Sequence, residues 1–179
     1  MQVKYTIEKI IENKEIQEFL FFWGHTEKEK GIAGKHYLSQ WWPSAFVVDN
    51  IEYKTAEHWM MARKAHLFGD MKMFNEITQC EDPKNVKALG RKIKGFEEEL
   101  WVKHRYEIVK EGNFHKFNQS EKLRNFLLST DDKVLVEASP FDKIWGIGMS
   151  VNDSNIISPD KWRGLNLLGF ALMEVRDQL

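Results

Sequence analysis

The chain has 179 residues, 42% of them hydrophobic and 30% charged, and a formal net charge of −1 at pH 7. A chain of this size can bury a core as one globular domain without disulfides or metals, and its near-zero charge gives no electrostatic case for generic nucleic-acid binding. The single cysteine, Cys80, excludes an internal disulfide framework and favours a reducing, cytoplasmic location. The sequence shows neither a signal-peptide core nor a run long enough to cross a membrane, so we expect no membrane association.

The N-terminal part of the chain predicts a short helix, a strand and a loop. Residues 4–13 are weakly amphipathic and are expected to form the helix. The run 19–23 is wholly apolar and precedes Gly24, which is typical of a buried strand. The segment 25–36 is polar, contains two glycines and is expected to be an exposed loop.

A hairpin followed directly by a helix is predicted next. Residues 45–48 and 51–54 flank Asp49-Asn50, a two-residue turn of the kind that joins antiparallel strands. The helix is expected over residues 55–68.

This helix carries an acid and a base on one face. Thr55 suits the N-cap position, and Glu57 lies in the first turn, where the helix dipole favours a carboxylate. Helical spacing places five side chains on one stripe: Glu57, Met60, Met61, Lys64 and Phe68. Because the stripe is otherwise apolar, it should face the interior. There Glu57 and Lys64 form either an internal ion pair or part of a functional site.

The remainder of the chain is predicted to be mostly helical. Helices are expected at 82–93, 96–110 and 120–128, and from residue 165 to the C-terminus. A break is expected at Gly112-Asn113. The β-rich run 133–138 predicts another strand, followed by a loop over 139–155. We therefore expect one compact α+β domain over residues 1–179, predominantly α-helical with a few short strands.

The long helix carries a second stripe, made by Trp101, Arg105, Ile108 and Gly112. A buried arginine beside a tryptophan is either a structural stacking pair or a grip for a phosphate, which the planar guanidinium suits. Gly112 is explained equally well as a helix C-cap. The residues of this helix leave both explanations open.

The loop after the last predicted strand is dense in polar and aromatic groups. Glu137, Asp142 and Trp145 lie within nine residues, and Gly146 and Gly148 permit positive φ angles or close approach of the backbone to a ligand. Since a lone Gly-x-Gly is common in ordinary turns, the density of groups indicates a site more than the glycines do.

Two residues near the start of the last helix also have two explanations each. Asn166 suits a cap or a hydrogen-bond donor to a ligand. Gly169 inside a helix costs about 1 kcal/mol against alanine, which either close packing or ligand approach would offset.

The sequence does not suggest a metal or a cofactor. His58 and His66 lack the i, i+4 spacing of a helical metal-binding pair, and no Cys/His cluster occurs. A P-loop and a dinucleotide-binding fingerprint are also absent. We expect neither a metal nor a cofactor.

In their order and spacing these segments resemble the NADAR family, which includes the YbiA-type N-glycosidases. The resemblance runs from about residue 19 to the C-terminus and rests on motifs that are individually weak. The matching segments are Leu38-Ser39-Gln40-Trp41, Tyr53-Lys54-Thr55-Ala56-Glu57-His58-Trp59 with Lys64-Ala65, Leu89-Gly90-Arg91, Trp101 with Arg105, Lys116-Phe117, Leu135-Val136-Glu137-Ala138-Ser139, Asp142 with Ile144-Trp145-Gly146-Ile147-Gly148, and Gly164-Leu165-Asn166-Leu167-Leu168-Gly169. Two features depart from the family pattern: Gln40-Trp41 replaces the Asn-Phe of many members, and the loop 25–36 is longer than in the shortest members. Both bear on substrate identity more than on fold.

The resemblance implies a YbiA-like fold and cleavage of N-glycosidic bonds between a ribose and a nitrogen. The substrates associated with it are the early, reactive pyrimidine intermediates of riboflavin biosynthesis, a role in metabolite damage control. Other members remove ADP-ribose from modified guanine in nucleic acid. The expected partner is therefore a small phosphoribosyl or ADP-ribosyl substrate, or an ADP-ribosylated nucleic acid, and neither reaction requires a metal or redox cofactor.

Breaking a ribosyl C–N bond builds positive charge on the sugar, so the site needs a carboxylate near C1′ and an activated water. Glu57 is the first candidate for that carboxylate, and Asp142 or Glu137 is the second acid, which protonates the leaving base or holds the water. Lys64 either keeps Glu57 ionised or contacts a phosphate. The other candidate substrate-binding residues are Arg105 and Lys116 for a phosphate, Trp101 and Trp145 as walls for the base or ribose, and Gly146 and Asn166.

An alternative from another class is a non-catalytic module that binds ADP-ribose or a related nucleotide. Such a module would keep the aromatic walls and the phosphate grip without needing two acids. The presence of Glu57, Asp142 and Glu137 together therefore favours the enzyme.

Overall fold

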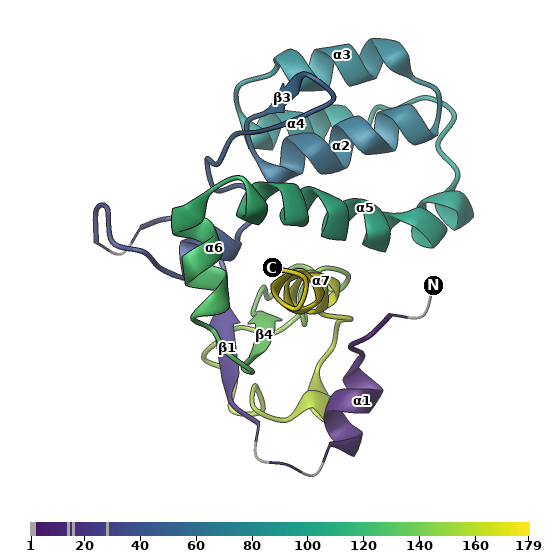
Figure 1. Ribbon diagram of the computed structural model, residues 1–179. Helices are drawn as coiled ribbons and strands as arrows, with labels where there is room; N and C mark the ends of the chain where they lie inside the picture. The colour runs from purple at the N-terminus through teal and green to yellow at the C-terminus, as the bar shows by residue number, and fades with distance from the viewer. Residues whose placement is uncertain (1–2, 14, 16, 28) are drawn as a thin grey trace. The chain divides into compact units, whose positions relative to one another are not determined.

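The computed structural model describes residues 3–13, 15, 17–27 and 29–179 (Figure 1). The chain forms two compact units. We call Gln40–Arg124 the central unit, and Met1–Ser39 together with Asn125–Leu179 the terminal unit, because the latter is built from both ends of the chain. Helices predominate and the strands are few and short, as predicted. A single domain over residues 1–179 stays a prediction.

The central unit is a group of helices around α2. Its elements are β2 (Phe46–Val48), β3 (Ile51–Tyr53), α2 (Ala56–Leu67), α3 (Met71–Gln79), α4 (Pro83–Gly90) and α5 (Glu98–Asn118), and α6 (Glu121–Leu128) begins in it. Helix α2 packs against α3, α4 and α5, and Figure 1 shows these helices close to one another. Most of α2 is buried, because its Trp, Met and Ala side chains meet neighbours on several sides.

The predicted hairpin and the predicted start of α2 are confirmed. Strands β2 and β3 pair antiparallel, and Asp49 and Asn50 both adopt positive φ angles, 51° and 62°. Two left-handed residues in succession form the turn type whose twist suits a hairpin, and Asn and Asp tolerate that conformation. Thr55 caps α2, as its position predicts.

In the central unit, two predicted helix limits were wrong and one helix was missed. Helix α5 continues through Gly112 and Asn113, where a break was expected, because both are engaged by packing: Gly112 lies against Trp59, and the Asn113 amide donates to the carbonyl of Val109 at 2.8 Å. Helix α4 ends at Gly90 rather than at residue 93. Helix α3 was not predicted, although Asp70 caps it.

The terminal unit contains a short parallel pair of strands with a helix on it. Its elements are α1 (Ile7–Glu12), β1 (Phe19–Phe22), the 3₁₀ turn η1 (Lys35–Leu38), the end of α6, β4 (Val134–Glu137), the 3₁₀ turn η2 (Pro159–Lys161) and α7 (Leu167–Arg176). Strands β1 and β4 pair in register from Phe19 with Val134 to Phe22 with Glu137. Helix α7 packs against β4.

The predicted strand and loop near the N-terminus need correction. Strand β1 ends at Phe22, and Trp23 is 58% exposed rather than buried. Residues 25–27 and 29–35 are largely exposed, as expected, and Lys28 lies outside the described residues. The end of the segment enters η1, where His36 is buried against Tyr37 at a ring distance of 4.4 Å. The aromatic ring of Tyr37 anchors this turn.

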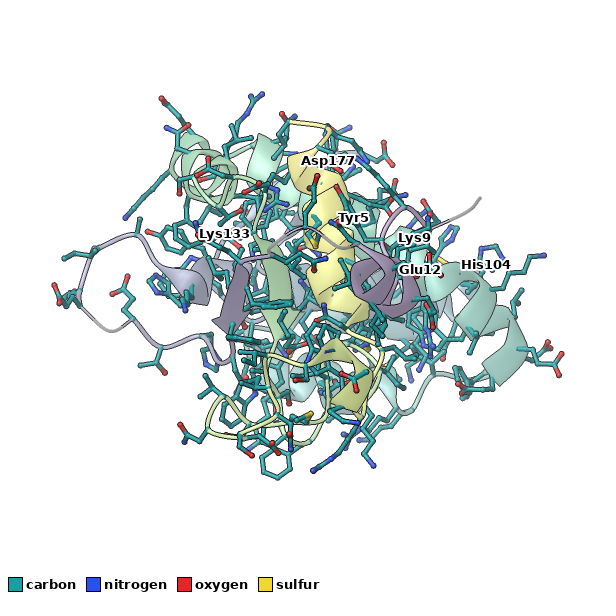
Figure 2. All side chains as sticks on the ribbon, turned by 90° about the horizontal axis from the view of Figure 1, so that it is seen from below. Tyr5, Lys9, Glu12, His104, Lys133 and Asp177 are labelled. Atoms are coloured by element: carbon teal, nitrogen blue, oxygen red, sulfur yellow. The ribbon has the colours of Figure 1, made fainter. Side chains whose placement is uncertain are left out.

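The N-terminal segment is tied to the end of α7. The backbone N–H of Lys4 donates to Oε1 of Glu174 at 2.8 Å, and its ammonium lies 2.6 Å from Asp177. The Tyr5 hydroxyl donates to the same Asp177 carboxylate at 2.8 Å, and Figure 2 shows Tyr5 and Asp177 near each other. These bonds join the two ends of the chain within the terminal unit.

Candidate active site

The first turn of α2 is held by buried hydrogen bonds. The Thr55 hydroxyl accepts from the backbone N–H of His58 at 3.3 Å. The buried His58 ring places Nδ1 2.8 Å from the Thr55 hydroxyl and Nε2 3.0 Å from the carbonyl oxygen of Cys80. Because a carbonyl only accepts, Nε2 donates to Cys80, and in the neutral imidazole Nδ1 then accepts from the Thr55 hydroxyl. Burial lowers the pKa of His58 and favours the same neutral form.

Glu57 is buried at this turn, with 2% of its surface exposed. Its backbone N–H donates to the carbonyl oxygen of Gln40 at 3.0 Å. The Gln40 side chain donates to Oδ1 of Asn113 on α5, also at 3.0 Å. The backbone of Glu57 is thus fixed to the segment before the hairpin, and that segment is fixed to α5. Helix α2 therefore presents a positioned, buried acid at its dipole-favoured end.

Lys64 lies on the same helix, but its ammonium contacts the end of α4 and residues near the start of α5. Its ammonium donates to the carbonyl oxygen of Gly90 at 3.1 Å and lies 4.2 Å from the ring centre of Phe96 and 5.4 Å from that of Trp101. Seven residues of helix separate it from Glu57, a rise of about 10 Å. Burial lowers the pKa of Lys64, and the nearby Glu98 carboxylate opposes this effect. These contacts hold Lys64 against the end of α4 and the start of α5.

Helix α5 carries the second predicted stripe, and the whole stripe is buried. Its members are Trp101, Arg105, Ile108, Gly112 and, one turn further, Lys116. Lys116 is 1% exposed, and burial lowers its pKa to about 7. The stripe therefore brings a guanidinium and an amine onto one buried helix face, with an indole at its start.

The close approach of α2 and α5 depends on Gly112. A Cβ at this position would overlap the indole ring of Trp59. The Trp59 Nε1–H donates to the carbonyl oxygen of Ile108 at 2.8 Å, one turn earlier on α5. The glycine explained above as a C-cap is a packing glycine in mid-helix. It sets the distance between the helix of Glu57 and that of Arg105 and Lys116.

In the terminal unit, Glu137 ends β4 and Asn166 holds that strand. The Asn166 Oδ1 accepts from the backbone N–H of Glu137 at 3.0 Å, and its Nδ2 donates to the carbonyl oxygen of Leu135 at 2.9 Å. Asn166 has a φ of 53° at the N-cap of α7 and makes no side-chain cap. A Cβ at Gly169 would overlap the carbonyl oxygen of Leu135, so close packing explains this glycine.

Asp142 organises the loop after β4. Its Oδ1 accepts from the backbone N–H groups of Ile144 and Trp145, both at 2.8 Å. The loop then packs tightly: a Cβ at Gly146 would lie 2.7 Å from the carbonyl oxygen of Glu137, and Gly148 has a φ of 65°. Gly148 thus has the positive φ angle that the sequence suggested, whereas the close approach at Gly146 is to the chain's own backbone, and approach to a ligand stays a prediction.

The predicted site residues thus fall into two groups. Glu57, Lys64, Trp101, Arg105 and Lys116 belong to the central unit, and Glu137, Asp142, Trp145, Gly146 and Asn166 belong to the terminal unit. The roles given to all ten residues stay predictions.

Sequence reasoning missed the residues that position Glu57. His58 was considered only as a metal ligand, and Asn113 only as part of a helix break. Gln40 was identified only as a departure from the family pattern. No local signal in the sequence connects these residues, since the bonds that join Gln40 to Asn113 span 73 positions.

Among residues 3–13, 15, 17–27 and 29–179, no group of three or more His, Cys, Asp or Glu side chains is placed to hold a metal ion. In the same residues, none of the helices combines the length and apolar character needed to cross a membrane.

Comparison with known proteins identifies what this arrangement is similar to. Residues 21–179 match the model of the NADAR domain. N-glycosidase R617 of Acanthamoeba polyphaga mimivirus is 44% identical over 169 residues, which cover 92% of this chain and 98% of the viral protein. N-glycosidase YbiA of Escherichia coli K12 is 31% identical over 138 residues, covering 77% and 76%. The NMR structure of the E. coli protein YbiA matches with a TM-score of 0.70 at 25% identity, covering 92% of this chain and 86% of that one.

Proposed function

The chain belongs to the NADAR family, and from this membership we propose that it hydrolyses the C–N bond between ribose and base in a phosphoribosylated or ADP-ribosylated compound. It is an N-glycosidase, and so a hydrolase, like the relatives that carry that name. The leading substrate class is that of the early pyrimidine intermediates of riboflavin biosynthesis.

The observation that carries this proposal is the position of Glu57. Departure of the base leaves an oxocarbenium-like sugar, and an adjacent carboxylate stabilises its positive charge. Glu57 is a carboxylate in the first turn of a buried helix, and the hydrogen bond from its backbone to Gln40 fixes that turn. Preorganisation of this kind is effective because no reorientation is needed as charge develops.

The proposed reaction consumes one water. The water oxygen forms a bond to C1′ as the C1′–N bond breaks, and the electron pair of that bond passes to the base nitrogen. The nitrogen gains a proton from the second acid, Asp142 or Glu137, and the water passes one of its protons to the carboxylate that this acid becomes, which restores the acid. Asp142 already accepts two backbone hydrogen bonds at Oδ1, which commit this side chain to holding its own loop. Of the two, Glu137 is therefore the stronger candidate for the proton donor.

The basic groups on the buried face of α5 support the proposal that the substrate is anionic. Arg105 and Lys116 bring two basic groups to it, and Trp101 adds a flat wall. Arginine suits the bidentate recognition of a phosphate. The two groups lie eleven residues apart on α5, a rise of about 16 Å, so each is a separate candidate contact for an anionic group. Removal of ADP-ribose from guanine in nucleic acid is the second candidate function.

The test is hydrolysis by wild type and by Glu57→Gln. Purified protein is incubated with the riboflavin intermediates and, separately, with ADP-ribosylated guanosine, and the free base and free sugar are quantified. We expect E57Q to lower the rate by a factor on the order of 10²–10⁴ with a nearly unchanged melting temperature. Glu52→Gln is the matched control, since Glu52 is an exposed acid of the hairpin, and it should keep the wild-type rate.

The substrate that releases product identifies the activity. A wild-type rate in E57Q would overturn the role of Glu57. If neither compound releases product but both bind, the chain is a non-catalytic nucleotide-binding module instead.

A further inference from the structure

The terminal unit contains a cavity to which the proposed reaction assigns no role. Its volume is about 480 Å³, which lies within the range of small-molecule sites, roughly 300–1,000 Å³. The end of β1 and the loop after it form most of the wall, and Ala138 and Val151 complete it from the other end of the chain. A cavity of this size is more than a packing defect, because protein interiors leave few voids larger than a water molecule.

Exposed apolar side chains surround this cavity. Trp23, Ile32 and Val151 all line it and are each more than half exposed. Phe141 extends the group, since its ring lies 6.2 Å from that of Trp23 and is 86% exposed. Clustered apolar exposure of this kind marks a binding surface rather than a stable solvent-facing patch. Two of the four side chains are aromatic rings that offer a flat face.

A few polar groups accompany the apolar wall. Thr26 and Glu29 line the cavity together with Lys35. Small-molecule sites use such isolated polar groups to orient a ligand held mainly by apolar contact. A carboxylate only accepts hydrogen bonds, so the ligand edge that faces Glu29 carries N–H groups. The amino and ring N–H groups of pyrimidines and purines fit this requirement, and the flat ring fits the indole.

The cavity also adjoins the acid of β4. Phe22, which lines it, pairs with Glu137 across the two strands. The backbone N–H of Ala138 donates to the carbonyl oxygen of Phe22 at 2.9 Å, and Ala138 is itself part of the wall. Glu137 is therefore adjacent in sequence to Ala138, a residue of the cavity wall.

We infer that this cavity binds the planar nitrogenous base of the substrate, with Trp23 as its stacking surface and Glu29 as an acceptor for its N–H edge. The inference rests on the proposed N-glycosidase function and gives Trp23 and Glu29 a part in substrate specificity.

The test is direct binding to protein labelled with ¹⁵N at its tryptophan side chains. The indole N–H signal of Trp23 is assigned by its loss in Trp23→Phe. We expect this signal to shift when 5-aminouracil or guanosine is titrated, and to stay in place with ribose 5-phosphate, which has no base. Because the Trp23 variants lack this signal, their affinities are measured by isothermal titration calorimetry. Trp23→Leu should weaken binding of the base by about 5- to 100-fold, the loss of one stacked ring, whereas Trp23→Phe keeps a ring and should stay within a few-fold of wild type.

Glu29→Gln replaces one acceptor oxygen with a donor and should also weaken binding. Ile157→Ala is the matched control: Ile157 is an exposed apolar residue of the same unit that does not line the cavity, and its loss should leave affinity unchanged.

The measurement is made in the E57Q background, so that no substrate is consumed and the two proposals fail separately. If hydrolysis is absent but the bases shift the Trp23 signal, the cavity assignment stands without the proposed reaction. If the Trp23 signal responds to neither base, or responds equally to ribose 5-phosphate, the cavity assignment is overturned whatever E57Q does to the rate. If Trp23→Leu does not fold, E29Q decides the question by titration of the Trp23 signal, and Trp23→Phe is compared with wild type by calorimetry.

Discussion

Lys116 carries a pH dependence that follows from its burial. Its pKa is lowered to about 7 in the folded chain, whereas an exposed lysine of the unfolded chain has a pKa of about 10.4. Since the folded pKa is the lower one, the unfolded state binds the proton more tightly between these values. The contribution of Lys116 to the free energy of unfolding is therefore greatest above about pH 10 and falls as the pH drops toward about 7, below which it no longer changes.

Replacing Lys116 by methionine removes this dependence while keeping an unbranched side chain. We expect K116M to be more stable than wild type near neutral pH, and the difference to shrink as the pH rises toward about 10. Urea unfolding at several pH values measures it. Lys103→Met, at an exposed position of the same helix, should show no such trend. A stability difference for K116M that is constant with pH would contradict the lowered pKa.

At the scale of the elements, the contact between α2 and α5 depends on the absence of one side chain. Gly112 lies against the Trp59 indole, which is itself fixed by its bond to Ile108. We expect Gly112→Ala to lower the free energy of unfolding by about 1–3 kcal/mol, because overpacking outweighs the gain in helix propensity. Chemical unfolding checks it.

Glu111→Ala is the matched control for this prediction, since Glu111 is the exposed neighbour on the same helix. It should change stability by no more than about 0.5 kcal/mol. Increased stability of Gly112→Ala would show that the two helices are not in close contact at this point.

The contact of α7 with β4 depends on a polar side chain instead. The Asn166 amide serves one backbone N–H and one carbonyl of the strand and is itself buried. Asn166→Ala leaves buried groups unsatisfied, and we expect a loss of about 1–3 kcal/mol in the free energy of unfolding. If Asn166 only contacts substrate, the stability of the variant will match wild type and only its KM will rise.

At the scale of the whole molecule, local signals predicted the elements and distant contacts decided their extent. Thr55 and Asp82 were correctly placed at helix starts, because a cap needs only the three residues that follow it. The same reasoning wrongly broke α5 at Gly112, since the partner that makes a glycine useful there is Trp59 on another helix.

The residues of the candidate site also divide into those that local sequence signals indicated and those that only the fold revealed. Glu57 of α2 and Arg105 of α5 were recognisable from sequence, because helical spacing assigns each to an otherwise apolar face, whereas Lys116 became a candidate only through the family resemblance. The groups that position Glu57 were not, and neither was the cavity beside Trp23, since both are made by residues far apart in the chain.

The sequence by itself determined the helical character of the fold, because caps and periodicity act over a few positions, and its motifs carried the resemblance that indicated the family and the proposed reaction. Only the tertiary structure decided that β1 pairs with β4 across more than a hundred residues, that Lys64 is held by Gly90 and two aromatic rings, and that Asn166 holds a strand. The physical reason is that buried polar groups and close-packed surfaces take whichever partner the fold brings to them, and sequence distance does not specify that partner.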